Sequence, residues 1–334
     1  MRIRFGLLLL SFTGLLAAST LGGYHVLKEI PVPGDGTKDY LTVDEGARRL
    51  YVSHGTQVNV IDLDSEQVVG KVSDLKGAHG IAIAPKLGRG FITNGLLNTV
   101  TIFDLKTLQH LGELEAGVGP DGILYDSATG RVFVDNKHGG TVTAFGAADG
   151  KLVGTIEVDG DPESIASDGK GSVWFNIEHK NFLVRIDTQK LTVTGHWPTA
   201  PCKGPGPIAI DREHRRLFIG CSSEVMVVAN PDTGEIITTL PIGIDVDGTA
   251  FDPSTGLIFS ANADSVTVIH EDSPDKYSVV ENVKTQPEAN TVALDPKTHR
   301  VYLSTGNYDP VPKPGQRPTP SMLPGTFKVL VLDR

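Results

Sequence analysis

Several residue types and motifs on which common chemistries depend are scarce or missing in this chain. Only two cysteines occur in 334 residues, and neither belongs to a Cys-x-x-Cys-His motif, so covalently attached c-type haem is excluded. No Gly-x-Ser-x-Gly segment is present, which excludes the nucleophile elbow of α/β-hydrolases. A glycine-rich loop ending in Lys-Ser or Lys-Thr, which would cradle a nucleotide phosphate, is also missing.

Positive charge is in short supply. Acidic residues outnumber Lys and Arg by 40 to 30, and the longest basic tracts are the pairs Arg48-Arg49 and Arg215-Arg216, both in predicted turns. Nucleic-acid binding depends on a basic patch that neutralises phosphates. We therefore expect no nucleic-acid partner.

Long hydrophobic runs are absent after the first 20 residues. Residues 1–19 combine Arg2 and Arg4 with an apolar run from Phe5 to Leu16 and small residues at 17–19, an order typical of a secretory signal peptide. The run is shorter than the roughly 20 residues that a membrane helix needs. We expect cleavage near Ser19 and a soluble, monomeric periplasmic or secreted chain, residues 20–334, without a membrane span.

The rest of the sequence repeats one unit seven times. The turn-start residues of the copies are separated by 40, 42, 42, 43, 41 and 43 residues, and they are Asp44, Ala84, Asp126, Asp168, Asp211, Asp252 and Asp295. Each copy contains four strand-like runs such as DGILY, RLYVS, TVTIFDL and LVGTIEV, bounded by turn residues, and helix signals are absent. The pattern predicts an all-β, seven-bladed β-propeller with four antiparallel strands per blade in a single domain.

The ends of the sequence predict how the ring closes. The seventh copy stops after its third strand, FKVLVLD, whereas residues 24–32, YHVLKEIPV, precede the first copy as a strand without a unit of its own. Pairing these two segments would complete blade seven and remove the exposed edges of an open sheet.

The copies RLYVS, RGFIT, RVFVD and RVYLS, each followed by a strand similar to Val-x-Val-Ile-Asp, resemble the YVTN-type β-propeller repeat of exported bacterial proteins. The resemblance covers essentially the whole chain after the leader, with copies four and six, SVWFN and LIFSA, departing most. It implies the propeller fold, whereas the family includes binding, surface-layer and lactonase-like proteins.

Two other kinds of propeller are excluded by missing motifs. The repeated Gly-His and Trp-Asp signatures of WD propellers are missing, since Trp-Asp does not occur and Gly-His occurs once, at residues 195–196. Two tryptophans are too few for the repeated docking motifs of quinone-cofactor propellers. We expect Trp174 and Trp197 to pack between blades.

The innermost strand of each blade should present one side chain at the mouth of the central channel. The seven equivalent residues lie five positions before the turn-start residues, and they are Asp39, His79, Asp121, Glu163, Gly206, Asp247 and Asn290. Carboxylates that converge on one axis raise each other's pKa, and a bound cation or cationic ligand would relieve that repulsion. The loops between second and third strands should add His54, His138 and His179 on the same face.

Three interpretations of this face remain open. Asp39, Asp121, Glu163 and Asp247 would suit Ca²⁺ or Mg²⁺, and His79 or His54 would extend the set to Zn²⁺. With a cation that polarises a carbonyl, His79 would be the candidate base of a metal-dependent, lactonase-like hydrolase or lyase. Alternatively, the polar residues line a hydrated channel.

The remaining predictions concern blades five and seven. Cys202 and Cys221 fall on the same face of blade five, which in an exported protein favours a disulfide over two free thiols. Residues 308–325, with six prolines, replace a short loop of blade seven and form either a lid, a partner-binding segment or a disordered loop. The leading hypothesis is a non-enzymatic protein that binds a small ligand, a metal ion or a partner protein at the acidic face.

Overall fold

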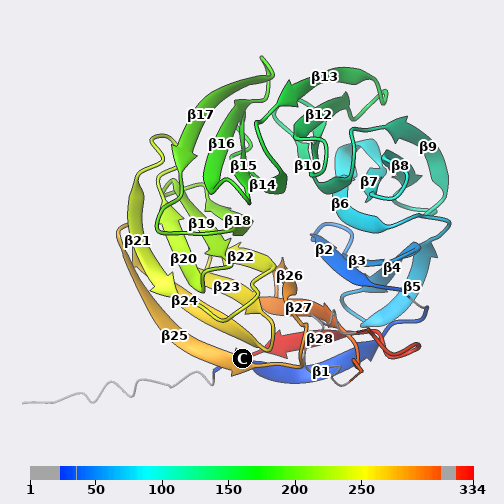
Figure 1. The fold of residues 1–334 in the computed structure, drawn as a ribbon. Helices are drawn as coiled ribbons and strands as arrows, with labels where there is room; N and C mark the ends of the chain where they lie inside the picture. The colour runs from blue at the N-terminus through cyan, green and yellow to red at the C-terminus, as the bar shows by residue number, and fades with distance from the viewer. Residues whose placement is uncertain (1–22, 35, 310–320) are drawn as a thin grey trace, which may run out of the picture.

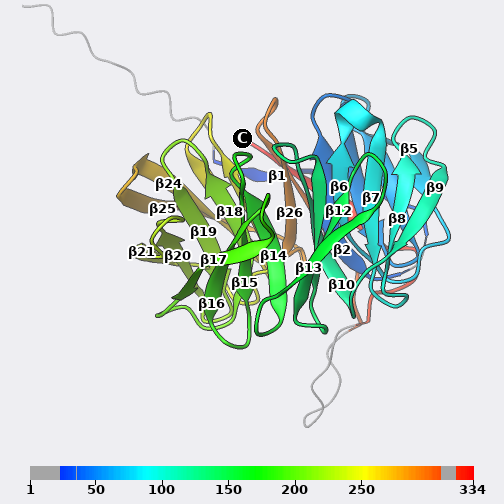
Figure 2. The same ribbon diagram turned by 90° about the horizontal axis from the view of Figure 1, so that it is seen from above.

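The computed structural model describes residues 23–34, 36–309 and 321–334, which form a ring of seven sheets around a central channel (Figure 1). Every sheet has four antiparallel strands, and the edge-on view shows the loops gathered on the two faces of the ring (Figure 2). The predicted all-β, seven-bladed propeller is confirmed. The predicted leader, residues 1–19, and residues 310–320 of the proline-rich loop lie outside the described residues.

The blades follow one another along the chain. Blade one contains β2 (Lys38–Asp44), β3 (Arg49–His54), β4 (Gln57–Asp62) and β5 (Gln67–Val72), and blade two contains β6 (Ala78–Ala84), β7 (Arg89–Asn94), β8 (Thr99–Asp104) and β9 (His110–Glu115). Blade three contains β10 (Pro120–Asp126), β11 (Arg131–Asn136), β12 (Thr141–Gly146) and β13 (Leu152–Glu157), and blade four contains β14 (Pro162–Ser167), β15 (Ser172–Ile177), β16 (Phe182–Asp187) and β17 (Thr192–Pro198). Blade five contains β18 (Pro205–Asp211), β19 (Arg216–Cys221), β20 (Val225–Ala229) and β21 (Ile236–Pro241), and blade six contains β22 (Gly248–Asp252), β23 (Leu257–Asn262), β24 (Ser265–Ser273) and β25 (Lys276–Lys284). Blade seven contains β26 (Thr291–Asp295), β27 (Arg300–Thr305), β28 (Lys328–Asp333) and β1 (His25–Pro31), and a single 3₁₀ turn, η1 (Pro85–Leu87), follows β6.

Strands from opposite ends of the chain close the ring. Blade seven has the strand order β1-β28-β27-β26, and the β1–β28 register runs from His25 opposite Asp333 to Pro31 opposite Lys328. Tyr24, at the start of this segment, packs in the core shared with blade six. The predicted closure by residues 24–32 is confirmed.

The hydrophobic core lies between the blades. Each of seven buried clusters combines side chains from two neighbouring blades. At the junction of blades one and two, for example, the rings of Tyr51 and Phe103 lie 5.8 Å apart between centroids. The β-branched and aromatic residues of the second and third strands supply most of this core, because both faces of these strands are covered.

The repeated turn-start aspartate has two tasks. In blade six, Oδ1 of Asp252 accepts a hydrogen bond from the backbone N–H of Ser254 at 3.0 Å, which fixes the turn. The aspartate also contacts a basic side chain in the next blade: Nδ1 of His299 lies 2.7 Å from Asp252. Arg48 binds Asp295 through two hydrogen bonds of 2.7 and 2.8 Å, which links blade one to blade seven.

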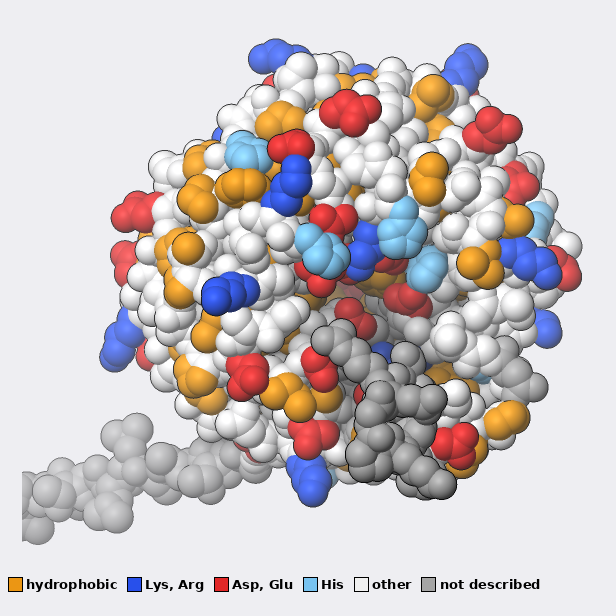
Figure 3. All heavy atoms as spheres, viewed as in Figure 1, with side chains coloured by type: hydrophobic (Ala, Val, Ile, Leu, Met, Phe, Trp, Pro, Cys, Tyr) orange, Lys and Arg blue, Asp and Glu red, His pale blue; other side chains and the backbone are white. Residues whose placement is uncertain are grey.

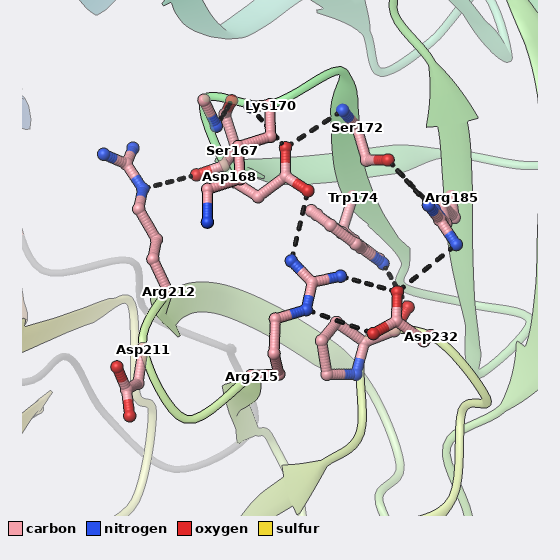
Figure 4. Close-up of polar contacts among 12 residues, drawn as sticks. Ser167, Asp168, Lys170, Ser172, Trp174, Arg185, Asp211, Arg212, Arg215 and Asp232 are labelled. Atoms are coloured by element: carbon pink, nitrogen blue, oxygen red, sulfur yellow. Dashed lines mark hydrogen bonds and ion pairs between the residues drawn. The ribbon is translucent and has the colours of Figure 1, made fainter.

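The junction of blades four and five is built around Trp174 (Figure 4). Its side chain is fully buried, and its indole N–H donates to the backbone oxygen of Pro231 at 2.9 Å. The guanidinium carbons of Arg185 and Arg215 each lie 5.6 Å from the indole ring centroid, and both side chains pair with Asp232. Trp197 covers Gly234 of blade five, so both tryptophans pack between blades as predicted.

Two further sequence predictions can be compared with the structure. Cys202 and Cys221 form a disulfide with an S–S distance of 2.08 Å, which confirms the predicted pair. Both cysteines are buried. In the part of the chain that the structure describes, no helix has the length and apolar character needed to cross a bilayer.

Candidate functional site

The mouth of the channel is formed by the beginnings of the innermost strands. These strands depart from regular pairing near the mouth: the register shifts between Lys38 and Leu41, between Ala78 and Ile81, and between Glu163 and Ile165. A bulge turns a strand locally and redirects its side chains. In the view along the channel, acidic and histidine side chains gather around the central hollow (Figure 3).

Three of the predicted residues form a compact group across three blades. Nδ1 of His79 in blade two lies 2.5 Å from Oδ2 of Asp39 in blade one and 3.6 Å from Oδ1 of Asp121 in blade three. One ligand atom from each of the three residues lies within 4.8 Å of the others. This arrangement can hold a positive charge, either the proton of an imidazolium or a metal ion.

The electrostatics of this group follow from burial and from the neighbouring carboxylates. Burial acts to lower the pKa of His79, but the hydrogen bond and charge of Asp39, with a contribution from Asp121, outweigh it and raise the pKa. Burial, with the charge of Asp39, raises the pKa of Asp121 to about 6. His79 and Asp121 therefore hold a proton at higher pH than the free side chains would.

Two lysines enter the mouth beside the acidic residues. Lys137 forms an ion pair with Glu163 and lies 3.4 Å from Oε2 of Glu178. Burial and the charge of Asp121 raise the pKa of Glu163, and Lys137 opposes this shift. On the opposite side, Lys38 donates a hydrogen bond to the amide oxygen of Asn290.

Asp247 differs from the other acidic residues of the mouth. Its carboxylate is exposed to the channel, and no hydrogen bond or ion pair involves it among the described residues. Confinement by the walls of the channel raises the pKa of Asp247 to about 6, although the charge of Lys38 acts to lower it. Neither Asp247 nor Glu163 belongs to the group of Asp39, His79 and Asp121.

The three additional histidines predicted for this face occupy different surroundings. His138 lines a hollow of about 330 Å³ together with His79 and Asp121, so it belongs to the mouth. His179 lies at the outer rim, 77% exposed, where it pairs with Asp161. His54 is buried, and its ring stacks on Phe327 with centroids 3.8 Å apart, away from the mouth group.

The site predicted from the sequence did not include two residues that lie below the mouth, Tyr40 and Asp135. Tyr40 lines the channel, and burial, followed by the charges of Asp121 and Glu163, raises its pKa well above the usual range. Asp135 is fully buried in β11, where one carboxylate oxygen accepts the N–H of Gly122 at 3.1 Å and the other has no partner among the described residues. Asp135 is the penultimate residue of β11, the second strand of blade three. A comparison of this position across the seven blades would have identified it.

The equivalent residues of four other blades donate a hydrogen bond to the next blade. In each case the acceptor is a backbone oxygen of the next blade. The pairs are Ser53 with His79, Thr93 with Asp121 at 2.6 Å, Asn176 with Gly206 at 2.8 Å and Ser304 with Asp39 at 3.3 Å. Asp135 can act as such a donor only when it is protonated. Burial, followed by the charges of Asp121 and Glu163, raises its pKa well above the usual range.

We expect Asp135→Asn to increase the free energy of unfolding at pH 8 by about 1 kcal/mol. The amide of Asn can donate the hydrogen bond to the next blade at any pH, whereas the buried carboxyl group of Asp135 can donate it only when it is protonated. The unfolded chain releases this proton near pH 4, whereas the folded chain keeps it. Wild-type stability is therefore lost as the pH rises from about 4 toward the raised pKa of Asp135. Urea unfolding from pH 5 to 8 should show a growing advantage of the variant. Asn176→Asp is the matched control and should lose stability over the same range; equal pH profiles for Asp135→Asn and the wild type would contradict the prediction.

Two other groups of metal-binding residue types lie outside the mouth group. Asp161, Glu178 and His179 form one at the rim. Asp211, His214 and Glu271 form the other at a turn on the opposite face, where Nδ1 of His214 lies 2.7 Å from Asp211 and 3.3 Å from Glu271. They supply controls for any measurement of metal binding at the channel.

Comparison with known proteins gives the fold. No family model matches the chain, and no curated protein matches its sequence. Among solved structures, a chain of Kuenenia stuttgartiensis hydrazine synthase is similar with a TM-score of 0.71 and 16% identity, over 84% of this chain and 96% of that chain. At this identity the likeness shows a shared propeller fold and carries no statement about activity.

Proposed function

We propose that this chain is an exported, YVTN-type binding protein whose channel mouth takes a small, positively charged ligand. The observation that carries the proposal is the excess of carboxyl groups: Asp39, Asp121, Glu163 and Asp247 converge there, against the lysines Lys38 and Lys137. Burial of Asp121 and confinement of Asp247 by the channel walls, with the charge of Asp39, raise the pKa values of these two carboxyl groups to about 6. A bound cation would offset the repulsion among these carboxyl groups.

A divalent metal ion is the simplest such ligand. The group of Asp39, His79 and Asp121 offers one nitrogen and two carboxylate oxygens, a donor set that suits Zn²⁺ and similar ions. Lys137 and Glu163 neutralise each other beside this group, so they favour a site of three ligands over a larger ring of carboxylates.

We expect the protein to bind about one equivalent of Zn²⁺ at this group, measured by calorimetry at pH 7.5. Asp39→Asn and Asp121→Asn should each weaken binding tenfold or more, because each removes a charged ligand. Affinity should fall from pH 7.5 to 5.5 as Asp121, with a pKa of about 6, and His79, with a raised pKa, take up protons. Asp161→Asn and Asp211→Asn report on the two other groups and should retain this binding; unchanged affinity in Asp39→Asn would assign the metal elsewhere.

A metal-dependent hydrolase or lyase is the second candidate. Asp39 contacts Nδ1 of His79, and Nε2 points toward Gly95, where an added Cβ would lie 2.6 Å from it. A carboxylate that orients an imidazole whose other nitrogen faces a hollow is the arrangement expected of a general base. Zn²⁺-dependent turnover of simple lactones that disappears in His79→Ala would favour this candidate, whereas full turnover in the variant would remove that role from His79.

A further inference from the structure

A cavity of about 180 Å³ continues from the mouth into the channel. Its walls come from the residues two positions after the mouth residues in each innermost strand, and these are Leu41, Ile81, Ile123, Ile165, Ile208, Thr249 and Val292. Six of the seven are aliphatic, so the ring is apolar except at blade six. The cavity has room for several water molecules or one small organic molecule.

Blade six supplies the charged side of this cavity, and Tyr40, Thr42, Ser164 and Thr291 add polar residues from other blades. Asp247 is its one charged lining residue, and it is the acidic mouth residue whose carboxylate has no hydrogen bond or ion pair among the described residues. By contrast, Asp39 and Asp121 lie beside His79, and Glu163 pairs with Lys137. Lys38, whose charge reaches Asp247, donates its hydrogen bond to Asn290 instead.

Two polar atoms without hydrogen-bond partners among the described residues lie behind the walls of the cavity and are closed off from it. The hydroxyl oxygen of Thr249 is buried and has no hydrogen-bond partner in the described part of the chain. Across the channel, the free carboxyl oxygen of the fully buried Asp135 faces Gly122, where a Cβ would lie 2.3 Å from it and 3.5 Å from the hydroxyl of Tyr40. Neither atom is open to the cavity, so Asp247 remains the charged group available to a molecule inside it.

We infer that the channel cavity binds a small organic monocation, with its ammonium group at Asp247 and its alkyl part against the ring of aliphatic side chains. A hard divalent ion is a poorer occupant, because such ions take six or more oxygen ligands, whereas the cavity offers one carboxylate and a ring of six aliphatic side chains. An uncharged alkyl molecule would leave Asp247 unpaired. The inference rests on the proposed function, since it names a ligand class for the same channel.

The test uses n-butylammonium as the probe and n-butanol as its neutral counterpart, titrated into the mature protein and followed by NMR. We expect n-butylammonium to bind at least tenfold more tightly than n-butanol. Asp247→Asn should remove at least tenfold of that affinity, and Asp247→Glu should keep it within about threefold. Asp161→Asn, in the separate group at the rim, is the matched control and should bind the ammonium probe as the wild type does.

The outcomes separate this inference from the proposed function. Equal affinity for n-butanol, or an unchanged affinity in Asp247→Asn, would overturn the ammonium site. Zn²⁺ binding that is lost in Asp39→Asn, without any ammonium binding, would overturn the inference and leave the binding function in place. Failure of both ligands would remove both proposals. Thermal unfolding of each variant establishes that it is folded, and Asp247→Ser, with the same expected loss of affinity, replaces Asp247→Asn if that variant does not fold.

Discussion

Replacement of Trp174 by alanine should lower the free energy of unfolding by about 3–5 kcal/mol, the usual effect of truncating a buried tryptophan. The indole is fully buried between blades four and five. Its removal eliminates the hydrogen bond that the indole N–H donates to the backbone oxygen of Pro231. Its removal also leaves Arg185 and Arg215 without the ring on which both lie. Equilibrium unfolding in urea, followed by far-ultraviolet circular dichroism, measures the change.

Two controls separate the packing of Trp174 from the charges around it. Asp232→Asn removes the partly exposed carboxylate that both arginines contact, and it should cost no more than about 1 kcal/mol because the solvent screens such pairs. Trp197→Ala should cost less than Trp174→Ala, because Trp197 is only partly buried. A decrease in the unfolding free energy of less than 2 kcal/mol for Trp174→Ala would contradict the prediction. It would show that neighbouring side chains repack into the space left by the indole.

Removal of the disulfide should produce the second large effect. The bond closes a loop of 19 residues between the entry to blade five and the end of β19. On the chain-entropy account, a loop of this size contributes about 3 kcal/mol. We therefore expect the double variant Cys202→Ala/Cys221→Ala to lose about 3 kcal/mol of unfolding free energy in a urea titration.

The reduced wild-type protein is the control for this prediction. Both cysteines are buried, so a reductant should reach the bond only when blade five opens. After unfolding in reductant, the wild type should refold with the stability of the double variant. An unchanged urea midpoint in the double variant would show that strand pairing alone fixes this loop.

The architecture was predictable because one local pattern occurs seven times. Each copy carries the same alternation and the same turn-start residue, so errors in a single strand do not change the assignment. The aspartates of these turns were useful markers, because Asp168, Asp252 and Asp295 contact basic side chains of the next blade. Closure by β1 followed from the missing fourth strand of the seventh copy.

The mouth was predictable in position but only partly in chemistry. Equivalent positions of a repeat identify which residues surround the axis, and Asp39, His79 and Asp121 do meet there. Lys38 and Lys137 were missed because they neighbour the aligned positions, yet they reach Asn290 and Glu163. Partner choice of this kind depends on side-chain direction and length, which the repeat period does not determine.

The pairing of β1 with β28 has a consequence for how the protein folds. The two strands lie about 300 residues apart in the chain, since His25 pairs with Asp333 and Pro31 with Lys328. During synthesis, β1 therefore stays unpaired until β28 has been made, whereas blades one to six can form in order before that. Contacts of such sequence separation carry the largest loop-closure entropy and form slowly. Ring closure is accordingly the last step that this topology permits, and it is the step that converts a row of blades into a native molecule.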